Sequence, residues 1–223
     1  MTGELEDYIL GHIDPEPEAL ARLDRESNLR LPHGHMTSGH LQGRLLKMLV
    51  RMVHPERVLE LGTFSGYSSL CMAEAMELGA ELHSIELSDE LEPFIRRGWE
   101  RAAPKPGMTL HIGDALQVMR EMESGRFQLI FIDADKRRYP DYYPEAMRLC
   151  ADGGFIIADN TLWSGHVAES GRHDAQTDGL RRFNDMVAAD SSVEKVILPV
   201  RDGLTLIYKK IYKKPNSPAG VNQ

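Results

Sequence analysis

Three oxygen-bearing side chains follow two apolar segments of the chain. Asp133 comes directly after the first segment, which ends in residues 131–132. Asp159 and Asn160 come directly after the second segment, residues 155–158. Buried parallel strands are apolar along their length, and a doubly wound sheet gathers its chemistry at their carboxyl ends. If the two strands are neighbours, two carboxylates and one amide meet at one point, with Lys136 beside them. An all-oxygen set of this kind suits Mg²⁺, Mn²⁺ or Ca²⁺ and does not suit zinc or copper.

Acidic residues recur at the ends of the other apolar segments. Five segments close on a carboxylate or are followed at once by one, and these acids are Glu60, Glu86, Asp114, Asp133 and Asp159. A single acid of this kind is best explained as the N-cap of the helix after the strand. Five at equivalent positions exceed what capping needs, and they predict a ligand rich in hydroxyl and amino groups along this edge.

The loop after the first segment, Glu60 to Ser68, contains Gly62. A glycine at a strand-to-helix turn lets a ligand approach the backbone at the helix N-terminus. Glu86 follows Gly62 by 24 residues. Dinucleotide-binding folds place an acid on the ribose at a spacing of about 20 residues, so Glu86 fits that role. The full G-x-G-x-x-G pattern is missing from this loop. A loop with few glycines suits a nucleoside that has no pyrophosphate to hold.

Strand-like and helix-like segments alternate along the chain, which predicts a parallel sheet with helices on both faces. The expected strands are residues 58–61, 82–86, 110–112, 129–132, 155–158, 193–198 and 204–208. The expected helices are 4–30 (interrupted at Pro15 and Pro17), 41–53, 66–78, 89–101, one between Asp114 and Gly125, 139–150 and 177–189. Between residues 159 and 177 we expect a long loop. The last two strands flank a turn at 201–203 and are typical of a closing hairpin. The fold class is α/β: a Rossmann-like, doubly wound, mostly parallel seven-stranded sheet with an antiparallel edge hairpin and extra N-terminal helices.

Length and composition favour one enzyme-sized domain. We expect a single domain over residues 1–214, with residues 1–35 as a helical appendage and 215–223 as a disordered tail. With 223 residues and 42% hydrophobic content, the chain is able to bury a full core. No apolar run reaches the roughly 20 residues of a membrane span, and the acidic N-terminus does not follow the order of a signal peptide.

The cysteine content and the net charge indicate the compartment of the protein and the kind of partner it binds. Two cysteines, Cys71 and Cys150, make no disulfide framework, so a cytoplasmic location is expected. The formal net charge of −8 argues against DNA and against broad contact with any phosphate backbone. A small-molecule partner is the simpler expectation.

Together these segments resemble the cation-dependent class I S-adenosylmethionine O-methyltransferases, the family of the caffeoyl-CoA and catechol O-methyltransferases. The most specific part of the resemblance is the pairing of Asp133-Ala134-Asp135-Lys136 with Asp159-Asn160-Thr161-Leu162-Trp163. The other matching segments keep the family's order and spacing; they are Met36–Gly43, Leu59–Ser68, Ile85-Glu86, Gly113–Ala115 and Asp202-Gly203. The match spans residues 35–210.

The resemblance implies a role for each matching residue. Several residues are implied to hold S-adenosylmethionine: Met36 and Ser38 from the N-terminal side, Glu60, Gly62 and Ser68 at the methionine end, Asp135 at the amino group, Glu86 at the ribose, and Asp114 and Ala115 at the adenine. Asp133 is also implied to contact the cofactor. Asp133, Asp159 and Asn160 are implied to bind the divalent cation, and Lys136 and Asp133 to take part in catalysis.

The acceptor side is less defined. Trp163 and Ser164 follow the metal segment in the long loop, and we expect them beside the methyl acceptor. Plant caffeoyl-CoA enzymes have asparagine where this chain has Ser164, so the acceptor is left open. His166 and His173 lie in the same loop without an assigned role.

The chemistry follows from these residue types. A phenol is a weak nucleophile near neutral pH because its pKa is about 10. Two adjacent hydroxyls chelate a divalent cation, which lowers their pKa and orients one oxygen. Lys136 then accepts or stabilises the departing proton, and the oxygen attacks the sulfonium methyl in line. The leading expectation is therefore metal-dependent O-methylation of a small acceptor with vicinal hydroxyls. The resemblance also implies a homodimer, because members of the family are commonly dimers.

Two other functions compete. Some relatives methylate a hydroxylated uridine in tRNA, and Arg137-Arg138 with Arg181-Arg182 supply a local basic patch, although the net charge disfavours this. A nicotinamide-dependent oxidoreductase explains Glu86 but leaves the metal ligands and Lys136 unused. A non-catalytic scaffold is least favoured, since all three ligand positions and the lysine are present.

Overall fold

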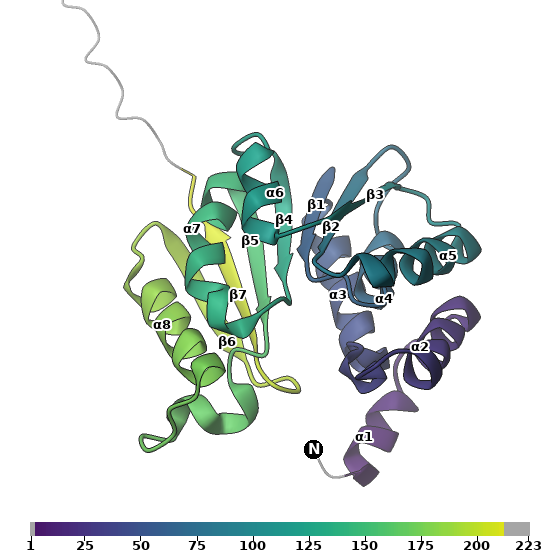
Figure 1. The fold of residues 1–223 in the computed structure, drawn as a ribbon, viewed down its shortest axis with the longest axis horizontal. Coiled ribbons are helices and arrows are strands. Elements are labelled where there is room, and N and C mark those ends of the chain that lie inside the picture. The colour runs from purple at the N-terminus through teal and green to yellow at the C-terminus, as the bar shows by residue number, and fades with distance from the viewer. Residues whose placement is uncertain (1–2, 212–223) are drawn as a thin grey trace, which may run out of the picture.

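The central strands of the sheet are buried on both faces, as their continuous apolar sequences require. The structure is a computed structural model that describes residues 3–211, and its seven strands form one sheet in the order β3-β2-β1-β4-β5-β7-β6 (Figure 1). The strands are β1 (Arg57–Leu61), β2 (Glu81–Glu86), β3 (Gly107–Ile112), β4 (Phe127–Ile132), β5 (Cys150–Asp159), β6 (Val193–Leu198) and β7 (Leu204–Lys209). β7 runs antiparallel to β5 and β6, and the other neighbouring strands are parallel. The α/β class, the seven strands and the closing hairpin are confirmed.

Helices connect the parallel strands and precede the sheet. The α-helices are α1 (Gly3–Leu10), α2 (Glu18–Arg30), α3 (Gly39–Val53), α4 (Tyr67–Ala73), α5 (Glu92–Ala102), α6 (Ala115–Glu121), α7 (Tyr139–Leu149) and α8 (Ala175–Ala189). Short 3₁₀ segments are η1 (Gly34–Met36), η2 (Asp89–Leu91), η3 (Lys136–Arg138) and η4 (Trp163–Ala168). None of the helices within residues 3–211 has both the length and the apolarity needed to cross a bilayer.

Alternating side chains of the strands feed two cores, one on each face. In β4, Ile130 and Ile132 point into a cluster with α6, α7 and α8, which lie side by side over that face in Figure 1. Leu129 and Phe131 point into a second cluster with α3 and α4 on the opposite face. A third cluster joins α2 to α4 and α5. The sheet is thereby covered on both sides, and its carboxyl edge is left to carry the site.

Several boundaries differ from the sequence expectation. α4 ends at Ala73 instead of continuing to residue 78. Ala75 and Met76 pack into the second cluster, and the backbone N–H of each donates to the carbonyl three residues earlier in the chain. β5 begins at Cys150, before a register shift against β4. The loop expected after β5 contains η4. The expected tail, 215–223, lies outside the described residues.

Candidate active site

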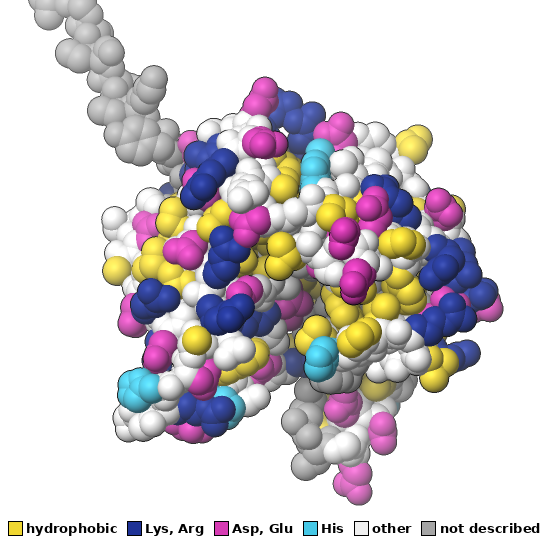
Figure 2. Space-filling view, viewed as in Figure 1, with side chains coloured by type: hydrophobic (Ala, Val, Ile, Leu, Met, Phe, Trp, Pro, Cys, Tyr) yellow, Lys and Arg dark blue, Asp and Glu magenta, His cyan; other side chains and the backbone are white. Residues whose placement is uncertain are grey.

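A cavity of about 660 Å³ opens at the carboxyl ends of the parallel strands. The sheet is extended from β1 in one direction by β2 and β3 and in the other by β4 and β5, and doubly wound sheets bind ligands at such a reversal. Loops after all five parallel strands line the cavity together with η1 and the β6–β7 turn. Figure 2 shows acidic side chains in the hollow at the middle of this face of the molecule.

Gly62 allows the loops after β1 and β4 to meet closely. Its φ is +91°, and a Cβ built on it would lie 2.1 Å from the carbonyl oxygen of Asp133. The Gly62 N–H donates to the Ile85 carbonyl at 3.0 Å, and the Asp133 N–H donates to the Leu61 carbonyl at 2.9 Å. Only glycine fits a left-handed backbone at this separation, so the residue fixes the floor of the cavity.

Glu60 lies beneath the cavity and does not line it. Its side chain is fully buried in β1, where its oxygens accept hydrogen bonds from Ser68 and Ser84, both at 2.5 Å, and from Ser69. Burial raises the pKa of Glu60 to about 7, although the three hydroxyls act in the opposite direction. The carboxyl group therefore holds the first turn of α4, including the cavity residue Ser68, in place.

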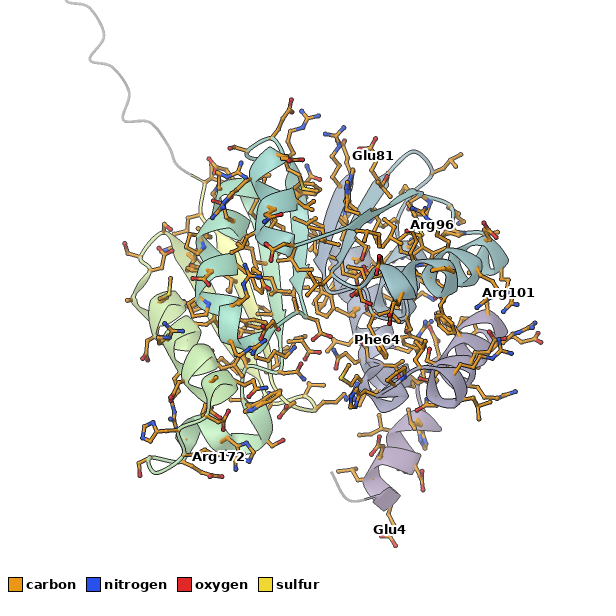
Figure 3. The ribbon with its side chains drawn as sticks, in the orientation of Figure 1. Glu4, Phe64, Glu81, Arg96, Arg101 and Arg172 are labelled. Atoms are coloured by element: carbon orange, nitrogen blue, oxygen red, sulfur yellow. The ribbon has the colours of Figure 1, made fainter. Side chains whose placement is uncertain are left out.

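Glu86 lines the cavity with both of its oxygens already oriented. One accepts from the Phe64 N–H at 2.8 Å and the other from the Ser88 N–H at 2.9 Å. Phe64 is labelled in Figure 3 and lies near the centre of the molecule at this edge of the sheet. Each carboxylate oxygen keeps a further lone pair, which suits the hydroxyls of a ribose.

Asp114 and Asp135 are N-caps of the helical segments that follow their strands, as expected for an acid at this position. Asp114 accepts from the backbone N–H of the first turn of α6 and pairs with Arg138, which lowers the pKa of Asp114. Asp135 caps η3 and pairs with Arg137 at 2.6 Å, and this hydrogen bond lowers the pKa of Asp135. Ala115 lines the cavity beside Asp114.

Lys136 is fixed between an acid and a buried tyrosine. Its Nζ donates to Asp133 Oδ1 at 2.6 Å and to Tyr139 Oη at 3.1 Å. The Tyr139 hydroxyl lies 3.0 Å from the Ile132 carbonyl and 3.1 Å from the Asp159 carbonyl, so it joins the ends of β4 and β5. Burial opposes the charge of Lys136, but Asp133, Tyr139 and Asp159 raise its pKa above the ordinary value. The two carboxylates and the tyrosine therefore favour the ammonium form of Lys136.

Asp159 is held by the start of α3 as well as by its own strand. Gln42 Nε2 donates to Asp159 Oδ2 at 2.5 Å, and the Asn160 N–H donates to Asp159 Oδ1 at 2.7 Å. Burial raises the pKa of Asp159 to about 6, and the negative charge of Asp133 adds to the shift. Asn160 has a left-handed φ of +57° and lines the cavity.

The donor set fits a hard divalent cation. Asp133 and Asp159 come from adjacent strands and repel each other, with Lys136 as the cation that offsets them. A cation between the carboxylates would remove this repulsion, and the Asn160 amide would supply a third oxygen. Among the described side chains, no three His, Cys, Asp or Glu form a group that could hold a metal ion, so the fit depends on that amide.

The expected acceptor residues lie differently from each other. Trp163 lines the cavity, and its ring also packs against the core formed with α6–α8. Ser164 is exposed outside the lining, and its N–H donates to Asp202. His173 is exposed and lies 3.3 Å from Asp178. The buried Nδ1 of His166 has no hydrogen-bond partner among the described residues.

The structure brings most of the sequence-predicted site residues into one lining. Those that line the cavity are Met36, Ser38, Gly62, Ser68, Glu86, Asp114, Ala115, Asp133, Asp135, Lys136, Asp159, Asn160 and Trp163. Glu60 and Ser164 are outside the lining. Sequence reasoning missed Gln42 and Arg201. The sequence does indicate that Gln42 is buried, because this polar residue falls on the apolar face of α3, four residues before the buried Leu46.

Comparison with known proteins identifies the family. A sequence model described as "O-methyltransferase" matches residues 12–210. A catechol O-methyltransferase of Niastella koreensis is 32% identical over 76% of this chain and 80% of the relative. A caffeoyl-CoA O-methyltransferase of Petroselinum crispum is 32% identical over 86% of this chain and 83% of the relative.

Solved structures agree with these matches. An O-methyltransferase of Bacillus cereus in complex with SAH superposes with a TM-score of 0.85 at 28% identity, covering 93% of this chain and 97% of the other. TomG of Streptomyces achromogenes, in complex with SAM, gives a TM-score of 0.85 at 28% identity over 93% of this chain and 96% of the other. This family assignment replaces the nicotinamide-dependent alternative. The chain belongs to the class I S-adenosylmethionine-dependent O-methyltransferase family.

Proposed function

We propose that this enzyme methylates a hydroxyl of a small catechol-like acceptor and that a divalent cation, Mg²⁺ by preference with Mn²⁺ or Ca²⁺ as alternatives, is required. The observation that carries the proposal is the meeting of Asp133, Asp159 and Asn160 beside Lys136 in one cavity. Relatives named catechol and caffeoyl-CoA O-methyltransferases support the acceptor class.

The cofactor half of the cavity lies over β1, β2 and β3. We propose that Gly62 and Ser68 border the methionine end of S-adenosylmethionine, with Asp133 and Asp135 toward its amino group. Glu86 accepts hydrogen bonds from the ribose hydroxyls. The adenine lies beside Asp114 and Ala115, and the cofactor is covered from the N-terminal side by Met36 and Ser38.

The catalytic half lies over β4 and β5. Asp133, Asp159 and Asn160 would hold the cation, which supplies the acidification and orientation of a vicinal diol. The acceptor hydroxyl gives up its proton to solvent water. Lys136, as an ammonium, donates a hydrogen bond to the resulting oxyanion, which takes the methyl group from the sulfonium and leaves S-adenosylhomocysteine. Tyr139 holds Lys136 at this point through the 3.1 Å contact. Trp163 forms the wall against which an aromatic acceptor packs.

The charges around the cavity favour a small acceptor over tRNA. The arginines that form a basic patch in the sequence are largely neutralised, since Arg137 pairs with Asp135, Arg138 with Asp114 and Arg181 with Asp178. Figure 2 shows Lys and Arg interspersed with Asp and Glu over the visible face. Salt-sensitive retention of tRNA by the protein on a gel would contradict this part of the proposal.

We also propose a homodimer. Val196 of β6 pairs with Leu206 on the sheet face that α3 covers, yet its side chain is 50% exposed. Met48 and Met52 of α3 are exposed as well. A second copy would cover this apolar edge. Light scattering should give the mass of two chains for the wild type and of one chain for Val196→Glu.

A reducing compartment, the cytoplasm, is proposed from the cysteines. Cys71 and Cys150 are buried free thiols, and burial raises the pKa of each to about 12. Such thiols behave as packing residues and not as reactive groups. Fractionation of the source cells, followed by detection of the chain, checks this assignment.

The first experiment is methyl transfer from labelled S-adenosylmethionine to caffeate with Mg²⁺, with EDTA, and with Asp133→Ala. We expect transfer to need both the metal and Asp133, with a loss of about a hundredfold or more in either case. Mn²⁺ binding followed by electron paramagnetic resonance gives a readout that does not depend on turnover.

The matched control is Asp152→Ala. Asp152 also pairs with a lysine, Lys209 at 3.3 Å, but it lies near the beginning of β5, away from the carboxyl edge. This variant should keep wild-type transfer. Transfer that persists in EDTA overturns the metal requirement, and cofactor binding without transfer to any catechol overturns the acceptor class.

A further inference from the structure

Three cationic side chains line the cavity, and two of them are paired with acids. Lys136 contacts Asp133 at 2.6 Å, and Arg138 pairs with Asp114. The third, Arg201, has no carboxylate partner within residues 3–211, where the structure gives it a hydrogen bond from Nη1 to Gln42 Oε1 at 3.4 Å. Arg201 is thus the lining cation whose charge is available to a ligand.

Arg201 occupies a backbone position that does not favour arginine. It is the second residue of the turn between β6 and β7, closed by the Gly203 N–H donating to the Val200 carbonyl at 3.0 Å. Its φ is +50°, in the left-handed region that glycine and asparagine adopt more easily. Non-glycine residues held in this region collect at binding sites, where the side chain compensates for the conformational cost.

The guanidinium points from this turn toward the beginning of α3. Its Nη1 lies 3.7 Å from the position that a Cβ on Gly39 would take. Gln42 accepts from Arg201 and donates to Asp159, so one side-chain amide separates the guanidinium from the proposed metal ligand. Arg201 therefore stands at the catalytic half of the cavity.

The rest of the lining is mostly acidic. Glu86 ends β2 and Asp114 follows β3, on the far side of β1, and the cavity as a whole is lined by five carboxylates against three cations. A ligand that carries an anionic group is repelled from most of this lining. At the Arg201 end it meets an unpaired guanidinium, whose planar fork binds a carboxylate through two parallel hydrogen bonds.

We propose that Arg201 binds a carboxylate on the methyl acceptor, so that the preferred substrates are dihydroxylated aromatic acids and not neutral catechols. This inference rests on the proposed function and names its substrate class. The hydroxyls lie at Asp133, Asp159 and Lys136, and the acid group lies at the β6–β7 turn. Arg201 is then a residue that determines specificity through direct contact with the substrate.

The test compares caffeate with its uncharged methyl ester in the wild type and in Arg201→Gln. We expect Arg201→Gln to lower kcat/KM for caffeate about tenfold, mainly through KM, and to change kcat/KM for the ester by about twofold or less. Arg201→Lys should retain part of the preference. The wild-type preference for the acid should weaken as salt is raised, because the guanidinium is exposed to solvent.

Arg126→Gln is the matched control. Arg126 is an exposed arginine that directly precedes β4, at the opposite edge of the sheet, and its loss changes the net charge equally. It should leave both substrates unaffected. An equal fall for acid and ester in Arg201→Gln would mean that Arg201 acts through Gln42 on Asp159, and it overturns the inference. Unchanged selectivity overturns it as well.

Binding separates this inference from the proposed function. Calorimetric titration of caffeate and its ester into the protein saturated with S-adenosylhomocysteine needs no turnover. If the wild type binds the acid more tightly than the ester and Arg201→Gln abolishes this difference, the inference is supported, whether or not either compound is methylated. Absence of methylation would count only against the proposed acceptor chemistry. Equal affinity of the wild type for acid and ester overturns the inference.

Discussion

At the scale of single residues, Gln42 is the side chain through which α3 reaches the proposed metal site. It is buried, and its amide donates to Asp159 at 2.5 Å. Gln42→Leu keeps the volume and leaves one oxygen of a buried carboxylate without its donor. Because partners of metal ligands contribute roughly 10–100-fold to metal affinity, we expect the Mg²⁺ concentration for half-maximal transfer to rise by about that factor. Gln117→Leu, on the exposed face of α6, is the control. An unchanged Mg²⁺ requirement in Gln42→Leu contradicts the role.

Glu60 should make stability depend on pH. Burial raises its pKa from 4.5 to about 7, so the folded state binds the proton more tightly than the unfolded state. Stability should therefore fall as pH rises from about 4.5 to about 7, where the carboxyl group ionises in the core. The amide of Glu60→Gln does not titrate, so the Tm of this variant should fall less over that pH range than the wild-type Tm. The measurement uses protein treated with EDTA, and parallel profiles for the two proteins would show that Glu60 does not titrate there.

The residue scale also shows where sequence reasoning stops. Glu60 and Glu86 both stand at the carboxyl end of an apolar strand, Glu60 one residue before the end of β1 and Glu86 as the last residue of β2. Glu60 is buried and accepts hydrogen bonds from three serines, whereas Glu86 lines the cavity. Arg201 and Gln42 lie 159 residues apart in the chain and meet only in the fold. Contacts of this kind depend on loop conformation, which local patterns do not specify. The ligand cluster at the ends of β4 and β5 was predictable because parallel strands bring their carboxyl ends together.

At the scale of elements, close approach of the β1 and β4 loops determines the cavity floor. A Cβ at Gly62 would lie 2.1 Å from the Asp133 carbonyl oxygen, whereas a Cβ at Gly79, which has nearly the same φ, would have no atom of the described residues within 4 Å. Gly79→Ala should cost about 1 kcal/mol from backbone strain alone. Gly62→Ala adds a steric clash, so it should lower the free energy of unfolding by several kcal/mol more than Gly79→Ala does. It should also weaken cofactor binding. Urea unfolding and calorimetry of both variants measure this, and equal unfolding midpoints would contradict it.

Strands and helices were predictable to different degrees. All seven expected strands are present because each buried parallel strand is an apolar run followed by polar residues, a local signal. β3 and β5 begin earlier than expected, at Gly107 and Cys150. The end of α4 did not match, because the turn after Ala73 is stabilised by core packing of Ala75 and Met76. The two N-terminal helices agree with the interruption expected at Pro15 and Pro17.

At the scale of the whole molecule, α2 belongs to the body that carries the site. Leu20 and Leu23 are buried against α4 and α5, and Arg101 of α5 extends toward α2, where it pairs with Glu26 at 3.0 Å (Figure 3). Asp24 accepts from Thr37, which lines the cavity, at 2.5 Å. α1, by contrast, has no buried residue. We propose that α2 is part of the single domain and positions the N-terminal wall of the cofactor site.

Two leucines on the same helix test this proposal. Leu23 is 5% exposed and Leu29 is 77% exposed. Leu23→Ala leaves a void beside Gly98 of α5 and should destabilise the protein by about 2–4 kcal/mol, since truncation of a buried leucine loses both transfer energy and packing. Leu29→Ala should change stability by about 0.5 kcal/mol or less. Loosening α2 also releases Thr37, so Leu23→Ala should weaken S-adenosylmethionine binding at a temperature where the variant is still folded. If both variants unfold at the same temperature and bind the cofactor equally, α2 is an independent appendage and the site does not depend on it.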